Sequence, residues 1–295
     1  MAEYSNVDGS WDREAGQVVQ ILRGRWVYGV ISTLAEGPRT PRELHTELSD
    51  THRRLRWLVG DRPMPEGVLY KPLAAMLREG LLQYDNEHPP AAFPQIARYR
   101  LSPLSECLLG SLGQLAPWCD FNQRYLEQMT MTMYGMDPES PRQDIGTPDE
   151  RDEILLLRDR IGMAFGLFTP RWSWGLLSVI SKGPRSAREI FAANADRIDS
   201  APTTGRRTMP LDIGYEMLDW LVRCDLISTR DFGGADPSRV IYGPTELGST
   251  LVNTFRPIGE AMAVFRRELV EALRERRGLD ADNLPWPSAL LSLDD

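Results

Sequence analysis

Apolar residues recur along the chain at the three- and four-residue spacing of helices that bury one face. The first such helix lies around Val18–Leu22, and the next has its apolar positions at Val27, Val30, Ile31 and Leu34. The same succession returns in the second half, as Ile154–Phe168 and then Leu176, Leu177 and Ile180. The chain therefore predicts a mainly helical fold in which one arrangement of helices occurs twice.

The two halves are related by an internal repeat. Residues 24–44 (GRWVYGVISTLAEGPRTPREL) match residues 170–190 (PRWSWGLLSVISKGPRSAREI) without a gap at an offset of 146, with nine of 21 positions identical. The identical pairs are Arg25/Arg171, Trp26/Trp172, Gly29/Gly175, Ser32/Ser178, Gly37/Gly183, Pro38/Pro184, Arg39/Arg185, Arg42/Arg188 and Glu43/Glu189. Duplication of one folding unit explains this match, and it predicts an intrachain pseudo-dimer.

Each repeat continues with the same local signals. Gly-Pro ends the second helix, because glycine suits a helix C-terminus and proline cannot continue the hydrogen-bond ladder. A short helix follows at about Pro41–Leu48 and Ala187–Ala193. It opens on Thr40 or Ser186, with a glutamate three residues later, which is the pattern of a capping box.

A third helix and two short strands complete each repeat before a long closing helix. The third helix carries Leu69, Leu73, Met76 and Leu77 in repeat one and Leu218, Leu221 and Val222 in repeat two. The strands are expected near 81–85 and 98–101, and near 226–231 and 239–242, because glycine- or proline-rich tips separate them. The closing helices are expected at about 104–136 and 245–277. The predicted domains are residues 1–136 and 149–278, with a linker at 137–148 and an acidic tail at 279–295.

Charge and composition narrow the classes of function. The net charge is −8, yet residues 25–124 and 171–277 carry near +1 and +2, so the acidity lies in the ends and the linker. Cys107, Cys119 and Cys224 have no metal-ligand spacing, and no two of the three histidines stand at helical spacing, so no metal or other cofactor is expected. The N-terminal sequence resembles no leader and no long apolar run occurs, so we expect a cytoplasmic protein.

The residues resemble those of a known family of regulators. Gly24-Arg25-Trp26, Gly37-Pro38-Arg39, the helix with Leu69, Leu73 and Met76, and Tyr99-Arg-Leu-Ser-Pro-Leu resemble the HxlR-type winged helix-turn-helix proteins of the MarR-like superfamily. Arg171-Trp172, Gly183-Pro-Arg and Tyr242-Gly-Pro-Thr-Glu-Leu-Gly248 carry the resemblance in repeat two. It covers about residues 15–125 and 160–262. It implies two tandem winged-helix domains, mainly α with small β wings, in a transcriptional regulator that binds double-stranded DNA, with or without an effector.

In such a domain the third helix enters the major groove, and basic side chains beside it hold phosphates. The exposed positions of the third helix are expected to be Gly67, Tyr70, Lys71 and Ala74 in repeat one, and Asp212, Tyr215, Glu216 and Asp219 in repeat two. The carboxylates of repeat two would repel DNA, so repeat one is expected to make most contacts. The candidate DNA-binding residues are Arg39, Arg42, Arg53, Arg54, Arg56, Tyr70, Lys71, Arg98, Arg185, Arg188, Arg206, Arg207 and Arg239. Arg100, in the wing of repeat one, is a further candidate.

A second hypothesis takes the same scaffold as a small-molecule binding protein or biosynthetic enzyme without DNA binding. It predicts an aromatic-lined cavity between the repeats with a buried charged residue of perturbed pKa. The candidate ligand-binding residues are Trp57, Tyr70, His88, Trp118, Trp174, Tyr215 and Trp220. The sequence shows no glycine-rich phosphate loop, nucleophile elbow or metal-spaced cluster, so no catalytic residue is assigned. A third hypothesis, a protein-interaction module, predicts an exposed apolar patch instead. The sequence sets neither the operator nor the self-association of the chain, which is expected as a monomeric pseudo-dimer or a homodimer.

Overall fold

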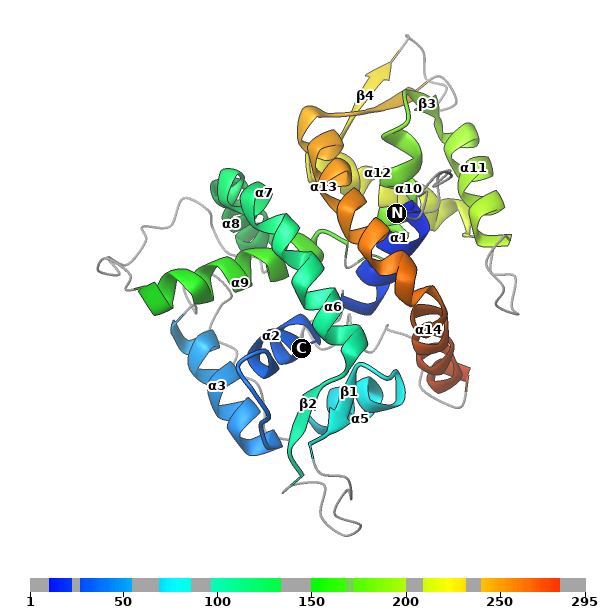
Figure 1. The fold of residues 1–295 in the computed structure, drawn as a ribbon. Helices are drawn as coiled ribbons and strands as arrows, with labels where there is room; N and C mark the ends of the chain where they lie inside the picture. The colour runs from blue at the N-terminus through cyan, green and yellow to red at the C-terminus, as the bar shows by residue number, and fades with distance from the viewer. Residues whose placement is uncertain are drawn as a thin grey trace, which may run out of the picture.

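The structure is a computed structural model of the 295-residue chain. It describes residues 11–22, 27–54, 69–85, 97–133, 150–168, 170, 172–199, 209–231 and 240–281. Within these ranges the side chains of residues 51–54, 150–156, 195–199, 231, 273, 274 and 276–281 are not described. The fold is mainly helical with two small antiparallel sheets, as expected from the apolar pattern (Figure 1).

The first half of the chain places three helices before a two-stranded sheet. After α1 (Trp11–Leu22) come α2 (Val27–Leu34), α3 (Pro41–Arg54), α5 (Tyr70–Arg78), β1 (Leu82–Tyr84) and β2 (Tyr99–Leu101). β1 and β2 are antiparallel, with Leu82 opposite Leu101. A bridge between Arg39 and Tyr99 joins the segment before α3 to the open edge of β2.

The second half repeats this order. After α9 (Glu150–Gly166) come α10 (Ser173–Ile180), β3 (Arg185–Ser186), α11 (Ala187–Asp199), α12 (Leu211–Arg223), β4 (Ile227–Asp231) and β5 (Val240–Pro244). The sheet order is β3-β5-β4, with Arg185 opposite Tyr242. β3 therefore occupies the place of the Arg39 bridge in the first half.

The turns between these helices follow the predicted chemistry in both halves. Gly37 and Gly183 adopt φ values of 130° and 138°, a conformation that glycine tolerates and other residues rarely adopt. The two capping boxes are confirmed: the amide of Thr40 donates to Glu43 Oε2 at 2.7 Å, and that of Ser186 donates to Glu189 Oε2 at 2.8 Å. Each glutamate amide donates back to the hydroxyl of its cap residue. Local sequence thus sets the same entry into α3 and α11.

The closing segments differ from the single long helices that were expected. The first consists of α6 (Pro103–Leu112), the 3₁₀ turn η2 (Gly113–Leu115), α7 (Ala116–Phe121) and α8 (Gln123–Met133). The second consists of α13 (Glu246–Met262), the 3₁₀ turn η4 (Ala263–Phe265) and α14 (Arg266–Ala281). Pro117, in the first turn of α7, has no amide hydrogen and cannot continue the ladder from α6. The expectation of one unbroken helix was wrong in both halves.

The first helix of each half packs into the other half. α1 contacts α13 most extensively, and also α10 and α14, whereas α9 contacts α2, α7 and α8. Figure 1 shows α1, in blue, beside α10 and α13 of the second half. α6 also contacts α13, so the closing segments meet between the two halves. Because each half donates a helix to the other, the core is continuous across the two.

Glycines on these helices permit the close approach. A Cβ on Gly259 of α13 would overlap the backbone carbonyl of Trp11 at the start of α1. A Cβ on Gly16 of α1 would lie 2.9 Å from the Trp174 ring, and one on Gly162 of α9 would lie 3.4 Å from the Tyr28 ring. Gly16 and Gly162 are related by the offset of 146, as are Tyr28 and Trp174. The two exchanged helices therefore pack in the same register.

The Gly259 contact gives a direct test of the packing between the halves. Gly259→Ala should lower the free energy of unfolding by about 1–3 kcal/mol, because an added methyl group must push α1 away from α13. Urea denaturation measures this change. The control is Gly110→Ala in α6, where no atom lies within 4 Å of the new Cβ. This variant should be more stable than the wild type by about 0.5–1 kcal/mol. An equal gain at Gly259 would contradict the close approach of α1 and α13.

Candidate nucleic-acid interface

α5 presents a cationic face in the first half. Leu73 and Met76 are buried under the helix, whereas Lys71 and Arg78 are exposed. Tyr70 is half-buried, and Ala74 is exposed between the two cations. The predicted outward positions from 70 to 74 thus lie on the accessible side of α5, apart from the partial burial of Tyr70. Arg78 was not predicted, although its position one turn after Ala74 signals the same face.

Two further arginines lie on and beside β2. Tyr99 and Leu101 point into the core, and the alternation of the strand leaves Arg100 exposed. Arg98 is exposed as well, and its Nη2 donates to the carbonyl oxygen of Pro38 at 2.7 Å. This bond attaches the arginine to the turn that precedes α3. The edge of the small sheet therefore carries two positive charges.

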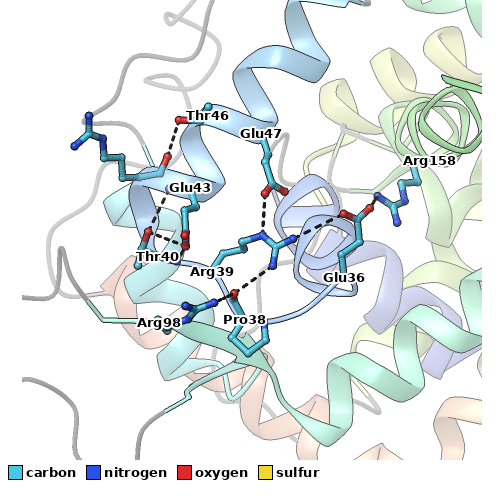
Figure 2. Close-up of polar contacts among 10 residues, drawn as sticks. Glu36, Pro38, Arg39, Thr40, Glu43, Thr46, Glu47, Arg98 and Arg158 are labelled. Carbon is cyan, nitrogen blue, oxygen red and sulfur yellow. Dashed lines mark hydrogen bonds and ion pairs between the residues drawn. The ribbon is translucent and has the colours of Figure 1, made fainter. Parts of the chain in front are cut away.

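Arg39 lies inside an ion network rather than on an open surface. Figure 2 shows its guanidinium between Glu47 of α3, at 2.8 Å from Nε, and Glu36 of the preceding turn, at 3.9 Å from Nη2. Glu36 in turn accepts from Arg158 of α9 at 2.7 Å. The hydrogen bond that Arg39 donates to Glu47 raises the pKa of Arg39 above its ordinary value. The network stabilises the α2–α3 turn. The DNA contact of Arg39 stays a prediction. The neighbouring Arg42 is exposed.

The corresponding face of α12 is acidic. Asp212, Glu216 and Asp219 are exposed, as the sequence predicted, and Tyr215 is 42% exposed. The exposed Arg223 pairs with Asp219 at 3.1 Å. Leu211, which starts the helix, is 65% exposed. This face therefore combines carboxylates with apolar groups, in contrast to α5.

The arginines at the start of α11 differ from their counterparts before α3. Arg188 is exposed. Arg185 is half-buried, and its Nε has no hydrogen-bond partner among the described residues. The position of Glu47 is taken by Ala193 and that of Glu36 by Lys182, so the carboxylates that hold Arg39 are absent here. Repeat two therefore has the arginine without these acidic partners.

The predicted tryptophan ligands do not meet in one cavity. Trp174 is buried against Phe168 and Phe255, and its Nε1 donates to the carbonyl of Asp12 at 3.1 Å. Trp118 donates to Thr250 Oγ1 at 3.2 Å, and Trp220 donates to the carbonyl of Leu167 at 3.0 Å. The indoles of Trp174 and Trp118 each connect the two halves, and that of Trp220 connects two segments of the second half. These are contacts of packing residues. Tyr215 instead lies exposed beside Phe191.

A cavity does lie between α1 and the second half. Its volume is about 300 Å³, and Trp11, Asp12, Ser178, Lys182 and Arg256 are among its lining residues. Arg256 lies over the Trp11 ring, with its guanidinium carbon 5.2 Å from the ring centre. Asp12 Oδ2 accepts from Ser178 and Lys182. Of the predicted ligand-binding aromatics that the structure describes, none lines this cavity.

Several predicted site residues lie outside the part of the chain that the structure describes. These are Arg56, Trp57, His88, Arg206, Arg207 and Arg239. Arg53 and Arg54 lie at the end of α3, but their side chains are not described. Their predicted roles stay predictions.

Comparisons with known proteins give no relative. No family model, no curated protein and no solved structure matches the chain. Among the described residues, no group of three or more histidine, cysteine or acidic side chains is placed to hold a metal ion. No helix in the described ranges has the length and apolar character needed to cross a bilayer.

One carboxyl between the halves has a strongly perturbed pKa. Oδ2 of Asp159 in α9 is buried, without a hydrogen-bond partner among the described residues. Burial raises the pKa of Asp159 to about 8, and the adjacent Arg158 opposes this rise. Burial, and next Asp159 itself, raise the pKa of the Tyr28 hydroxyl. The folded protein thus favours the protonated form of Asp159, as expected for a charge removed from water.

This shift predicts a pH-dependent stability. An unfolded aspartate has a pKa near 4, so between about pH 4 and pH 8 the unfolded chain binds fewer protons than the folded one. The free energy of unfolding should therefore fall as the pH rises through this window, by at most about 1.4 kcal/mol per unit from this group. Asp159→Asn should remove this component of the decline, as urea unfolding at several pH values would show. Asp212→Asn, at an exposed site, should leave the profile unchanged. A wild-type profile retained in Asp159→Asn would contradict the assignment.

Proposed function

We propose that the chain is a cytoplasmic DNA-binding regulator built from two tandem winged helix-turn-helix domains that pair within one chain. The proposal rests on the shared order of elements in the two halves, in which helix, turn, helix and third helix precede a two-stranded wing. It also rests on the exchange of first helices, which joins the halves as the subunits of a dimer. In this proposal α5 enters the major groove and β1–β2 contacts the backbone.

The observation that carries the proposal is the charge difference between the third helices. Lys71 and Glu216 follow the tyrosines Tyr70 and Tyr215, which stand at matching positions of α5 and α12. Both are exposed. Arg98 and Arg100 extend the positive charge of α5 onto the neighbouring strand. A polyanion is attracted to the first face and repelled by the second, so repeat one supplies the DNA contacts in this proposal.

The cavity beside Trp11 favours a second candidate function. The cavity of about 300 Å³ is lined by an aromatic ring and by two cations, Arg256 and Lys182, against the one carboxylate of Asp12, which fits a small anionic molecule. Such a ligand would act alone, in a protein without DNA binding, or as the effector of the regulator. The perturbed Asp159 lies elsewhere on the interface and does not line this cavity. The DNA proposal has the broader support, because it accounts for the exposed cations of α5 and β2, whereas the second candidate rests on one cavity.

DNA affinity across a salt series tests the proposed function. The triple variant Lys71→Ala, Arg98→Ala and Arg100→Ala should weaken binding to duplex DNA at least about tenfold. It should also reduce the slope of log affinity against log salt by about 2–3, because each lost phosphate contact removes close to one counterion. Fluorescence anisotropy between about 50 and 200 mM salt measures both quantities, on mixed-sequence duplexes and on DNA upstream of the coding region.

The matched control removes three exposed cations from repeat two, with Arg188→Ala, Arg223→Ala and Arg230→Ala. It changes the net charge by the same amount and should alter the affinity less than about threefold. Equal losses in both triple variants would show that binding depends on overall charge. No binding of the wild type at low salt would overturn the DNA proposal and leave the cavity as the site to study. Circular dichroism checks that each variant is folded.

A further inference from the structure

The exchanged helices α1 and α9 occupy matching positions in the two halves. Gly16 packs against Trp174, and Gly162 packs against Tyr28, so each contact is the copy of the other at an offset of 146. This register fixes which residues correspond. Asp12 of α1 corresponds to Arg158 of α9. Glu36, just after α2, and Lys182, just after α10, correspond as well.

At these matching positions the charges are exchanged. Lys182 Nζ lies 3.2 Å from Asp12 Oδ2, and Arg158 Nη1 lies 2.7 Å from Glu36 Oε1. In the first pair the exchanged helix carries the acid, and in the second it carries the base. Figure 2 shows the second pair, with Arg158 reaching Glu36 at the turn before α3. Both pairs are formed at the same place in the two copies of the unit.

A second pair of contacts follows the same scheme two residues further along each exchanged helix. Glu14 of α1 corresponds to Arg160 of α9. Arg266 Nε, at the start of α14, lies 2.5 Å from Glu14 Oε1, and Arg160 Nη1 lies 2.5 Å from Asp120 Oδ1, near the end of α7. The two partner residues, Asp120 and Arg266, also correspond at the offset of 146. The first helix of repeat one is again acidic and that of repeat two basic.

Pairing of like repeats would place equal charges in contact. Two copies of repeat one would bring Asp12 against Glu36 and Glu14 against Asp120. Two copies of repeat two would bring Arg158 against Lys182 and Arg160 against Arg266. The side chain of Glu14 is fully buried and that of Asp12 is 7% exposed, so replacing their cationic partners by carboxylates would bring like charges together out of water.

We propose that these exchanged charges form a recognition surface that accepts the opposite repeat and excludes a second copy of the same repeat. Its partner is a unit that carries bases where repeat one carries acids, which in this chain is repeat two. Repeat one thus pairs with repeat two, of the same chain or of another copy, and not with a second repeat one. This specificity uses repulsion as well as attraction.

A charge cycle at Arg158 and Glu36 tests the proposal in the full chain. Arg158→Asp installs at this position the residue type that repeat one has there, and so recreates the contact of repeat one with itself. Glu36→Lys installs the residue type of repeat two. Each single variant should melt roughly 2–4 °C below the wild type at low ionic strength. The double variant recreates the Asp12–Lys182 arrangement at the second site, and should melt within about 2 °C of the wild type.

The neutral variant Arg158→Gln separates exclusion from simple stabilisation. Exclusion requires that the like charge of Arg158→Asp lower the melting temperature further than the neutral side chain does. The comparison is made at Arg158, because Glu36 also lies 3.9 Å from Arg39. The difference should shrink at about 1 M salt, where charges are screened beyond about 3 Å. Equal melting temperatures for Arg158→Asp and Arg158→Gln, or a double variant as unstable as the sum of the singles, would overturn the proposal.

Discussion

The structure depends on the exchange of α1 and α9 between the two halves of the chain. Both helices pack mainly against the other half: α1 lies on α13, α14 and α10, with a smaller contact to α2, and α9 lies on α7, α8 and α2. The apolar surface that these helices bury is the main driving force for association of the halves. Because separation of the halves would expose both helices and both recipient surfaces at once, the halves are expected to fold as one cooperative unit. The relative position of α5 and α12 then follows from the helix exchange and not from the linker.

This shared frame carries two surfaces of opposite chemistry. The turns and caps are almost the same in both halves, as Gly37 and Gly183 and the two capping boxes show. The accessible positions have diverged, with Lys71 in α5 where α12 has Glu216. Such positions contribute little to stability, so they can change without loss of the fold. The turns and caps are retained and the exposed faces differ, so the difference between the halves lies in surface chemistry and not in the fold.

The elements that depend on local sequence could be predicted, and those that depend on distant contacts could not. The capping boxes and the glycine turns follow from residues three or four positions apart. The apolar stripe of α1 predicts a buried face, but periodicity does not say which half provides the opposing surface. The partners of Asp12 and Glu14 are 170 and 252 residues away in sequence. The interruption after α6 was missed, although Gly113 and Pro117 are local signals for it.

The same distinction applies to the candidate site. The outward face of α12 was predicted in full, because burial of Leu218 and Leu221 fixes the rotation of the helix. The role of Arg39 was not, since its contacts with Glu47 and Glu36 depend on the geometry of the turn. The perturbed carboxyl was expected at a cavity, but Asp159 is buried on α9 between packed helices. A single sequence shows where side chains are exposed more reliably than it shows which buried charges meet.

A chain that carries both repeats can diverge in ways that a homodimer cannot. In a homodimer every substitution appears twice, so an acidic third helix would be present in both subunits together. In a single chain the linker keeps the halves at a high effective concentration, and the two surfaces can change independently. The exchanged ion pairs extend this independence to the interface itself, since each half now differs in charge from its copy. One cationic and one acidic third helix are therefore compatible with one shared frame, and the first helices α1 and α9 differ in charge between the halves as well.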